Sequence, residues 1–361
     1  MTTSGKSPGR VVVVGGVAAG MSAASQIRRR RPDARVTVFE RGGYISYGAC
    51  GMPYNLEDPE RAIEDLVVLS PEKARKERGI ELELRHEVTE IDLERMDVEV
   101  ADLEGGGTRR EPFDALVVAT GARAVRLPLP GFDLPGVEVL RTLDDGAKIK
   151  HLLEDDPARV VVIGAGYIGM EMAHGHEETV ALVADELENH GVAVRTGAAV
   201  EGAEAGADGT VGAVVADGES FEADVVLVAA GVRPNAELAA AAGLRIGDTG
   251  AIWANQSQQS SHPAVWVAGD CAEAYHRVLR RNAWIPLGTT ANKQGRIAGA
   301  NVAGAEERYA GIVGTAGFVV FDLEVARSGL SEKEARAEGF DPVAVTIRQR
   351  SRAHAYPDGS P

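Results

Sequence analysis

The sequence of 361 residues contains little cysteine, few aromatic residues and a deficit of positive charge. It has 2 Cys, 5% aromatic residues, and 38 Lys and Arg against 54 Asp and Glu, for a formal net charge of −16. The two cysteines, Cys50 and Cys271, are too few for a disulfide framework, so we expect a reducing compartment, the cytoplasm. The acidic balance disfavours nucleic acid and anionic membranes as partners, but it is compatible with a small anionic ligand in a local basic pocket.

Long apolar runs, metal-site motifs and serine-hydrolase motifs are missing as well. The longest uncharged run near the N-terminus, 11–27, includes three Gly, two Ser and one Gln and falls short of a membrane span. Lys6 and Arg10 precede apolar residues, so a signal peptide is an alternative, but a glycine motif with a defined role occupies the same run. The histidines show no zinc-site spacing and no G-x-S-x-G is present, so we predict no metal site and no serine nucleophile.

Glycine is abundant instead, at 43 of the 361 residues, well above the usual share of about 7%. Its first concentration, 15–20, follows a predicted valine-rich strand at 10–14 and opens a helix. Such a turn places bare backbone N–H groups and a helix N-terminus against a pyrophosphate, although Val17 stands at the middle glycine of G-x-G-x-x-G. Glu40 ends the next strand at the spacing where a carboxylate binds ribose hydroxyls; a surface glutamate is the alternative.

The same pattern recurs at 159–169, where an apolar strand leads into a turn that matches the fingerprint fully. Apolar closing strands at 115–121 and 223–231 follow the two openings, so we predict two dinucleotide-binding units of the parallel α/β type. We expect further strands at 36–40, 80–84, 97–103, 264–270 and 346–352, a helix at 290–303, and a proline-rich link between the units at 128–135.

The second unit departs from the pattern after its glycine turn. A residue that distinguishes NADH from NADPH should follow about 20 residues later, and that count reaches Arg195, which would favour a 2′-phosphate. However, residues 170–182 run from one helix start into another around a glycine, with no strand between them. This indicates a segment missing near 174–178, either a true deletion or residues absent from the given sequence, so the nucleotide preference is left open.

Cys50 lies in the segment 45–54, directly after the first unit. A lone cysteine is more often a small buried hydrophobe than a nucleophile. Here Gly48 and Gly51 flank it and let a substrate approach, and Pro53 suits the first turn of a helix whose N-terminus favours a reactive thiolate. We therefore predict a redox-active Cys50, and we expect Cys271 to pack beside a cofactor-binding loop.

Two further features have a structural and a functional interpretation. Asp270 follows an apolar strand, where a carboxylate can accept a hydrogen bond from a ribityl hydroxyl, but it also suits an ordinary turn. The basic run 28–31 ends the first helix, where cations suit the helix dipole, and it is also compatible with a phosphate-binding patch.

Several longer motifs join these features: GGVAAGMSAA at 15–24, SYGACGMPY at 46–54, ATG at 119–121, GAGYIG at 164–169 with Glu171, GDCAE at 269–273 and PLGTTANKQGR at 286–296. Together they resemble the FAD-dependent pyridine nucleotide-disulfide oxidoreductases, from about residue 10 to 357. Within that family the chain is most similar to the single-cysteine branch, which contains coenzyme A-disulfide reductase and NADH oxidases. The Cys50 motif is the most specific part of the resemblance.

The resemblance implies an α/β fold with two Rossmann-like domains, the second inserted in the first. The FAD-binding domain would comprise 1–115 and 245–305, the NAD(P)H-binding domain 116–244, and an incomplete C-terminal α+β dimerisation domain 306–361. Cys50 would be catalytic, Tyr356 would assist it from the partner chain of a homodimer, and Ser46 and Asn292 would face the disulfide substrate. The cofactor-binding residues that it implies are Gly15, Gly16, Ala18, Ala19, Gly20, Glu40, Arg41, Val88, Thr120, Gly121, Gly164, Gly166, Tyr167, Ile168, Gly169, Glu171, Gly231, Asp270 and Thr290.

The function that follows is reduction of a disulfide through an external thiol. The positions five before and five after Cys50 are Ile45 and Asn55, so no second cysteine is placed to form an internal disulfide. Electrons from NAD(P)H, passing through FAD, would enter a mixed disulfide of Cys50 with a low-molecular-weight thiol, by the resemblance from coenzyme A disulfide. One alternative is an NADH oxidase or peroxidase with a Cys50 sulfenic acid. Another is a flavin-binding redox sensor.

Overall fold

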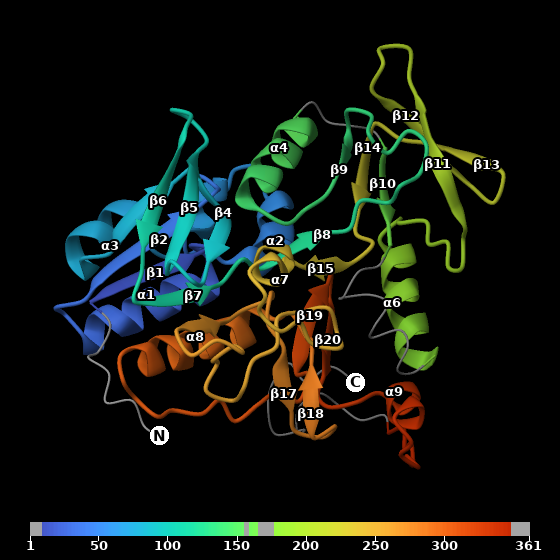
Figure 1. Ribbon diagram of the computed structural model, residues 1–361. Helices are drawn as coiled ribbons and strands as arrows, with labels where there is room; N and C mark the ends of the chain where they lie inside the picture. The colour runs from blue at the N-terminus through green and yellow to red at the C-terminus, as the bar shows by residue number, and fades with distance from the viewer. Residues whose placement is uncertain (1–8, 155–158, 165–176, 348–361) are drawn as a thin grey trace, which may run out of the picture.

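The computed structural model describes residues 9–154, 159–164 and 177–347 (Figure 1). Its largest sheet has five parallel strands in the order β16-β7-β1-β2-β3. The valines of β1 alternate between two apolar cores, with Val12 and Val14 on one face and Val11 and Val13 on the other. This burial on both faces explains the continuous apolar run. The strands are β1 (Arg10–Val14), β2 (Arg35–Glu40), β3 (Glu81–Leu84), β7 (Ala115–Val118) and β16 (Val265–Val267).

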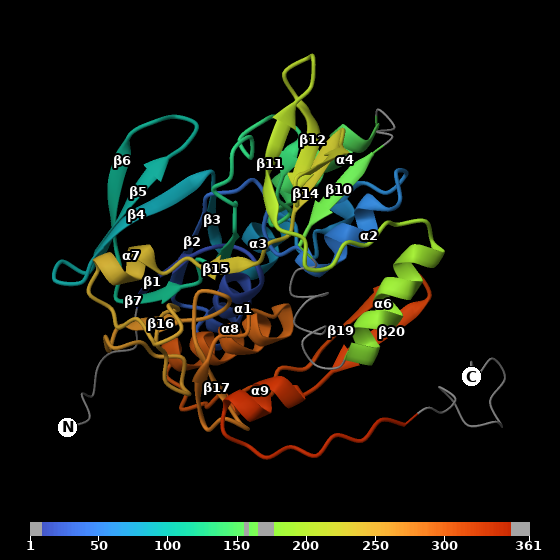
Figure 2. The ribbon, with the colours of Figure 1, turned by 90° about the vertical axis from the view of Figure 1, so that its right-hand side faces the viewer.

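Two helices, α1 (Ala18–Arg30) and α8 (Gly288–Val302), lie side by side over one face of this sheet (Figures 1 and 2). Their axes approach closely because α8 places glycine at the contact: a Cβ added at Gly295 or Gly299 would overlap the backbone of α1. The other face carries an antiparallel sheet of β4 (His86–Asp92), β5 (Asp97–Asp102) and β6 (Thr108–Pro112), together with α7 (Glu237–Ala241). The predicted strands at 36–40, 80–84 and 97–103 and the predicted helix at 290–303 are confirmed.

The second unit has a parallel sheet in the order β10-β14-β9 and an antiparallel sheet in the order β11-β12-β13. The chain crosses between the units along β8 and β15, which pair with each other. Phe132 of the proline-rich link is buried in the core of this second unit. The elements are β8 (Ala122–Ala124), β9 (Val137–Glu138), α4 (Leu143–Glu154), β10 (Val160–Ile163), α6 (Glu177–Asn189), β11 (Val200–Ala205), β12 (Val211–Ala216), β13 (Glu219–Glu222), β14 (Val225–Val228) and β15 (Val232–Pro234).

The remaining elements are short. Between β2 and β3 lie two 3-10 turns, Ala49–Gly51 and Ile63–Leu66, and the helices α2 (Met52–Leu56) and α3 (Pro71–Arg78). The C-terminal part contains the hairpins β17 (Ala274–His276) with β18 (Arg281–Ala283) and β19 (Ala316–Val320) with β20 (Leu323–Arg327), then α9 (Glu332–Ala337). Of the strand predicted at 346–352, Thr346 and Ile347 take no regular structure, and the rest lies outside the described residues. Within the described part of the chain, no helix is long and apolar enough to cross a membrane.

Candidate active site

The glycine turn after β1 is shaped by the close approach of the next strand. Gly15 has a φ of +101°, and a Cβ added there would overlap the carbonyl of Ala119 at the end of β7. A Cβ at Gly20, in the first turn of α1, would overlap the carbonyl of Gly15. Only glycine fits these positions, so the turn can lead directly from the end of β1 into the N-terminus of α1, the kind of helix end where phosphates bind. Ala18 and Ala19 form the first residues of that helix.

The carboxylate of Glu40, at the end of β2, is hydrogen-bonded to this turn. The backbone N–H of Gly16 donates to Oε2 at 2.6 Å, and that of Gly42 donates to Oε1 at 2.7 Å. Two charge-assisted hydrogen bonds fix the orientation of the carboxylate beside the glycine turn. Arg41 points to solvent and lies 3.9 Å from Glu87.

A second cluster of polar side chains lies at the carboxyl ends of β7 and β16. The Thr120 hydroxyl donates to the Asn235 carbonyl at 2.7 Å, and the Asn235 amide donates back to the Thr120 carbonyl at 2.9 Å. Asp270 accepts a hydrogen bond from Arg141 at 2.8 Å. Sequence reasoning missed Arg141, because it lies 129 residues from Asp270 along the chain. Gly121 has a φ of +68°.

Cys50 is exposed and free, within the turn that precedes α2. The N-terminal end of α8 also lies beside it, since a Cβ built at Gly288 would be 4.0 Å from the Cys50 sulfur. No side chain caps the start of α8, which has 15 residues against the 5 of α2. The start of the longer helix therefore lies next to the sulfur. The sequence indicated only the start of α2.

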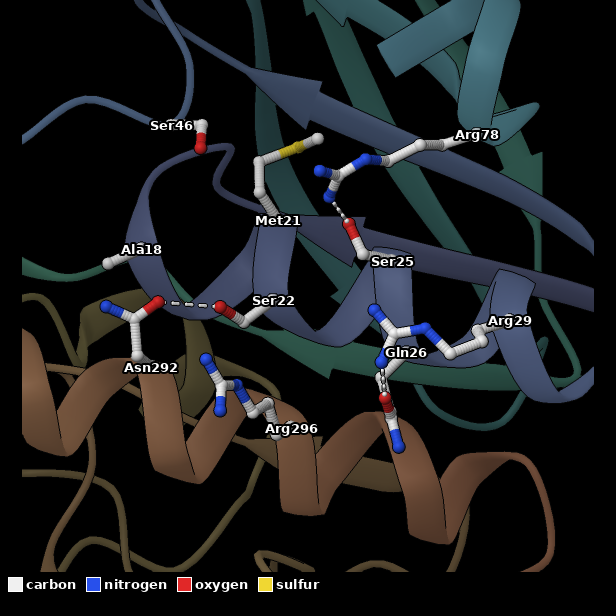
Figure 3. Close-up of a pocket in the computed structure, with 10 residues that line it drawn as sticks. All are labelled: Ala18, Met21, Ser22, Ser25, Gln26, Arg29, Ser46, Arg78, Asn292 and Arg296. Atoms are coloured by element: carbon white, nitrogen blue, oxygen red, sulfur yellow. Dashed lines mark hydrogen bonds between the residues drawn. The ribbon is translucent and has the colours of Figure 1, made fainter. Parts of the chain in front are cut away.

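A cavity of about 420 Å³ opens between α1, α3 and α8, next to the segment that carries Cys50 (Figure 3). Ser46 enters it from an unusual backbone conformation with a φ of +47°. Hydrogen bonds to Gly16 and Val68 hold that conformation. Thr290, predicted as a cofactor contact, is buried in the first turn of α8, and Val88 is buried on β4 in the core. The cavity is lined by Ala18, Met21, Ser22, Ser25, Gln26, Arg29, Ser46, Arg78, Asn292 and Arg296.

The lining of this cavity is basic, with three arginines and no acidic residue. Arg78 donates to the Ser25 hydroxyl at 2.6 Å, and Arg29 donates to Gln26 at 2.9 Å. The guanidinium of Arg296 has no hydrogen bond or ion pair among the described residues. The side chain extends from α8 toward the cavity (Figure 3). Asn292 accepts a hydrogen bond from Ser22 at 2.7 Å and donates to the Gly288 carbonyl at 3.1 Å. An anionic ligand would therefore meet positive charge on three elements.

The basic run 28–31 divides between the two roles predicted for it. Arg28 donates to three backbone carbonyls, those of Pro32, Ala34 and Arg78, and so has a structural role. Arg30 pairs with Glu307 and Arg31 with Asp33. Only Arg29 lines the cavity.

A family model for the pyridine nucleotide-disulphide oxidoreductases matches residues 9–180 and 175–306. The chain belongs to this family. The match covers most of the chain, including both glycine turns and Cys50. The oxidoreductase therefore has the α/β fold that the motifs predicted, and its cofactors are FAD and NAD(P)H. The alternative of a signal peptide at 11–27 is wrong, since these residues form most of β1, in the parallel sheet, and most of α1, which packs against that sheet.

Relatives of the oxidoreductase include enzymes of sulfur reduction and oxygen reduction. A protein from Pyrococcus horikoshii, an NAD(P)H coenzyme A polysulfide/persulfide reductase, is 37% identical over 97% of this chain and 82% of its own length. An NADH oxidase from Methanocaldococcus jannaschii is 32% identical over 97% of this chain and 82% of its own. The structure of an NAD-dependent persulfide reductase from A. fulgidus superposes with a TM-score of 0.91 at 36% identity, covering 97% of this chain and 69% of that one.

The first unit of the oxidoreductase fits FAD. Glycine at position 15 lets the turn pack against the Ala119 carbonyl at the end of β7 and lead into the N-terminus of α1, and the Glu40 carboxylate stands where ribose hydroxyls are expected. Asp270 and Thr120 lie at the carboxyl ends of neighbouring strands of the same sheet, where parallel α/β sheets bind their ligands.

In the second unit, fewer of the predicted site residues lie within the described part of the chain. Gly164 has a φ of +86° at the end of β10, and an added Cβ would be 2.9 Å from the Ala229 carbonyl; Gly231 has a φ of +98°. Arg195, reached by counting from the glycine turn, lies instead over the Phe221 ring on the antiparallel sheet, 6.0 Å from its centroid. The predicted site residues Gly166, Tyr167, Ile168, Gly169, Glu171 and Tyr356 lie outside the described residues, as does most of the predicted missing segment near 174–178.

Cys271 packs as predicted, in the core of the first unit. It is fully buried, and its thiol donates to the carbonyls of Val118 and Ala268. Burial raises the pKa of the Cys271 thiol, which keeps it protonated and unreactive.

Proposed function

We propose that the oxidoreductase reduces the sulfur–sulfur bond of coenzyme A disulfide or a coenzyme A persulfide through a mixed disulfide at Cys50. The observation that carries this proposal is a free, exposed Cys50 beside Gly288 at the start of α8, the helix whose Asn292 and Arg296 help to line a cavity with three arginines. The names of the relatives support it, since they include coenzyme A and a persulfide. The redox-sensor alternative is set aside, since the family and its relatives are enzymes.

Cys50 needs a thiol from outside the chain. Cys271 is fully buried, Cys50 is exposed, and both are free, so the two do not pair. Asn55, five positions after Cys50, is fully buried and its amide donates to the Ala62 carbonyl. Electrons delivered to Cys50 are therefore stored in a bond to substrate sulfur.

The cavity suits a phosphate-rich carrier of that sulfur. Coenzyme A has an adenosine 3′-phosphate and a pyrophosphate at one end and its thiol at the other. Arg29, Arg78 and Arg296 would neutralise the phosphates, and the thiol arm would follow the first turn of α8 from Asn292 toward Gly288, beside the Cys50 sulfur.

The chemistry has two balanced steps. In the first, the Cys50 thiolate attacks a coenzyme A sulfur of the substrate and the S–S bond breaks; the electron pair leaves on a coenzyme A thiolate when the substrate is the disulfide and on hydrosulfide when it is the persulfide. In the second, two electrons and a proton cleave the Cys50–coenzyme A disulfide, which releases coenzyme A thiol and restores the thiolate. When bound, FAD supplies those two electrons from NAD(P)H.

The decisive experiment omits nicotinamide nucleotides and oxygen. Enzyme with its FAD is reduced photochemically under anaerobic conditions and mixed with coenzyme A disulfide, and thiols are counted. We expect two thiols per reduced flavin, and intact-mass analysis of enzyme trapped before reduction should show a coenzyme A adduct that is lost in Cys50→Ser. Reduced flavin that stays reduced in the presence of the disulfide would exclude the proposal.

A second candidate is an NADH oxidase, which the name of the M. jannaschii relative supports. Its Cys50 would cycle through a sulfenic acid with oxygen or peroxide as acceptor. Oxygen-dependent NADH consumption without disulfide reduction in the same preparation would favour it.

The proposal includes a homodimer in the cytoplasm. Beyond α9 the chain exposes alternate apolar residues, Val343, Val345 and Ile347, at 89%, 79% and 71%. This alternation is typical of a strand that packs one face against a partner. Light scattering of the purified protein would test the dimer.

A further inference from the structure

We propose that Lys150, on α4, is a positioning residue for Cys50. Its ammonium group holds the Cys50 loop, residues 52–66, which follows the turn Ala49–Gly51 that carries the cysteine. The inference rests on the proposed function and deepens it, because it adds a residue from a distant segment to those that place the reacting sulfur.

The Cys50 loop begins and ends at the turn that carries the cysteine. Its first element, α2, starts at Met52, directly after that turn. At the other end of the loop, the Leu66 carbonyl accepts a hydrogen bond from the backbone N–H of Gly48 at 2.9 Å. A displacement of the loop is therefore passed on to the turn from both sides.

Little within the loop fixes its shape. The helix α2 has only 5 residues, too few to be stable alone. Residues 57–62, between α2 and the 3-10 turn Ile63–Leu66, form no helix or strand. Asn55 is buried, and its amide donates to the Ala62 carbonyl at 2.9 Å across the loop. The backbone carbonyls of this part of the loop depend on donors from other segments.

Lys150 supplies such donors from α4. Its Nζ donates to the carbonyl of Asn55, in α2, at 3.1 Å, and to the carbonyls of Asp58 and Arg61 at 2.7 Å and 2.6 Å. An ammonium group has three N–H donors, and here each of them meets a backbone carbonyl of the Cys50 loop. One side chain thus joins α2 to the turns that follow it.

The helix that carries Lys150 is itself packed against the loop. It lies beside α2 (Figure 1), and Leu143 of α4 is buried in one apolar cluster with Met52 and Ile63. Gly146 permits the close approach, since an added Cβ would be 3.1 Å from Ile63 and 3.6 Å from the Met52 sulfur. Lys150 follows Gly146 by one helical turn, on the same face of α4. The packing of α4 therefore places the ammonium group over the loop.

The consequence for the reaction concerns rate and not substrate affinity. The Cys50 sulfur first forms a bond to substrate sulfur and then receives two electrons at that bond, and a misplacement of about 1 Å can slow such steps about 100-fold. Lys150 does not line the basic cavity. We therefore expect its loss to slow the steps at Cys50 and to leave binding of the substrate phosphates unchanged.

The test compares Lys150→Ala with the unchanged enzyme, both with FAD bound. The Cys50 thiolate is first allowed to attack dithiobis(nitrobenzoate), which leaves a mixed disulfide on Cys50 and releases one coloured thionitrobenzoate; Cys271 is buried and does not react. FAD is then photoreduced by a light pulse without oxygen. Two electrons cleave the mixed disulfide, and release of the second thionitrobenzoate is followed by its colour. We expect this release to be about tenfold slower in Lys150→Ala.

Chemical rescue separates the position of the ammonium group from general stability. In Lys150→Ala, n-propylammonium replaces the atoms that were removed and offers three N–H donors, so it should restore most of the rate. Tetramethylammonium, which has no N–H, should not restore it. A rate in Lys150→Ala equal to that of the unchanged enzyme, or a loss that n-propylammonium does not reverse, would overturn the inference.

Lys150→Met keeps the inference testable if Lys150→Ala fails to retain FAD. The methionine preserves the apolar stem and removes only the ammonium group, so release should again be about tenfold slower. An unchanged rate in Lys150→Met would contradict the proposal. Lys76→Ala, at an exposed lysine of α3, is the matched control and should release thionitrobenzoate at the rate of the unchanged enzyme.

A second readout needs no electron transfer. The Arg61 carbonyl, which Lys150 holds, belongs to the peptide bond that trypsin cleaves after Arg61. Cleavage of this bond in the folded enzyme, measured by mass spectrometry, should be about tenfold faster in Lys150→Ala and unchanged in Lys76→Ala. Equal cleavage in Lys150→Ala and the unchanged enzyme would show that the ammonium group does not hold the loop.

Neither readout uses coenzyme A, so the two proposals fail separately. Normal release of thionitrobenzoate without reduction of coenzyme A disulfide would count against the proposed function alone. Reduction of coenzyme A disulfide with equal release from Lys150→Ala and the unchanged enzyme would count against the role of Lys150 alone.

Discussion

The two dinucleotide-binding units begin alike and end differently. Each has an apolar strand, a glycine at positive φ and a closing strand that stops at a second glycine. The first unit adds β2 and Glu40, and buries its opening strand on both faces; among the described residues of the second, β10 lies at the edge of a three-stranded sheet. The comparison teaches that the glycine turn is a local property of one strand and the turn after it, whereas the Glu40 carboxylate beside the turn comes from a further strand.

The largest effect on stability should come from a substitution at Gly15, in the glycine turn of the first unit. Gly15→Ala would drive a Cβ into the Ala119 carbonyl at a φ of +101°, whereas at Gly231, with a φ of +98°, nothing lies within 4 Å of an added Cβ. We expect Gly15→Ala to cost about 3 kcal/mol or more from overlap plus strain, and Gly231→Ala about 1 kcal/mol from strain alone. Thermal unfolding of the two variants should differ by about 4–8 °C at 2–4 °C per kcal/mol.

Equal Tm shifts in Gly15→Ala and Gly231→Ala would show that the backbone conformation of Gly15, and not its close packing, determines the cost of the substitution. Gly164→Ala should fall between them, because its added Cβ would be 2.9 Å from the Ala229 carbonyl.

A smaller effect should follow loss of the Glu40 charge. In Glu40→Gln the side chain keeps its size, but the charge-assisted hydrogen bonds from Gly16 and Gly42 are weakened or lost. At about 1.5–3 kcal/mol for a hydrogen bond to a charged group, we expect FAD affinity to fall about 10- to 100-fold, measured from the flavin that remains after dialysis. Glu94→Gln, at an exposed carboxylate, is the control and should retain all its FAD.

If Glu40→Gln keeps FAD as tightly as Glu94→Gln does, the carboxylate at the end of β2 does not bind the cofactor. The contrast between the two units would then lose its functional meaning.

The parts of the site that the sequence predicted are those built by neighbouring residues. The glycine turn, Glu40 and the Cys50 segment each depend on a strand, a turn and a helix that follow one another, so pattern and spacing were enough. The fold class followed from the same repeats. The segment missing near 174–178 stays a prediction, because most of it lies outside the described residues.

The parts that the sequence did not predict depend on contacts between distant segments. Arg296 faces the cavity because Gly295 and Gly299 let α8 lie against α1, some 270 residues earlier in the chain, as the bond from Ser22 to Asn292 shows. Arg78 reaches Ser25 from α3, and Arg141 reaches Asp270 across 129 positions. No periodicity identifies such partners, and an arginine on a helix is usually a solvated one.

The smallest effect concerns the basic cavity that we propose as the binding site for the substrate phosphates. Arg296 is exposed and lacks a protein partner among the described residues, so its pairing with a phosphate would be screened and worth about 1 kcal/mol. Arg296→Ala should raise KM for coenzyme A disulfide about fivefold and leave kcat within twofold, while KM for cystine, which has no phosphate, stays unchanged. Arg336→Ala, an exposed arginine on α9, is the matched control and should change neither KM. An equal rise in KM for both substrates would mean that Arg296 supports the shape of the site, and the basic cavity would then not be where the substrate phosphates bind.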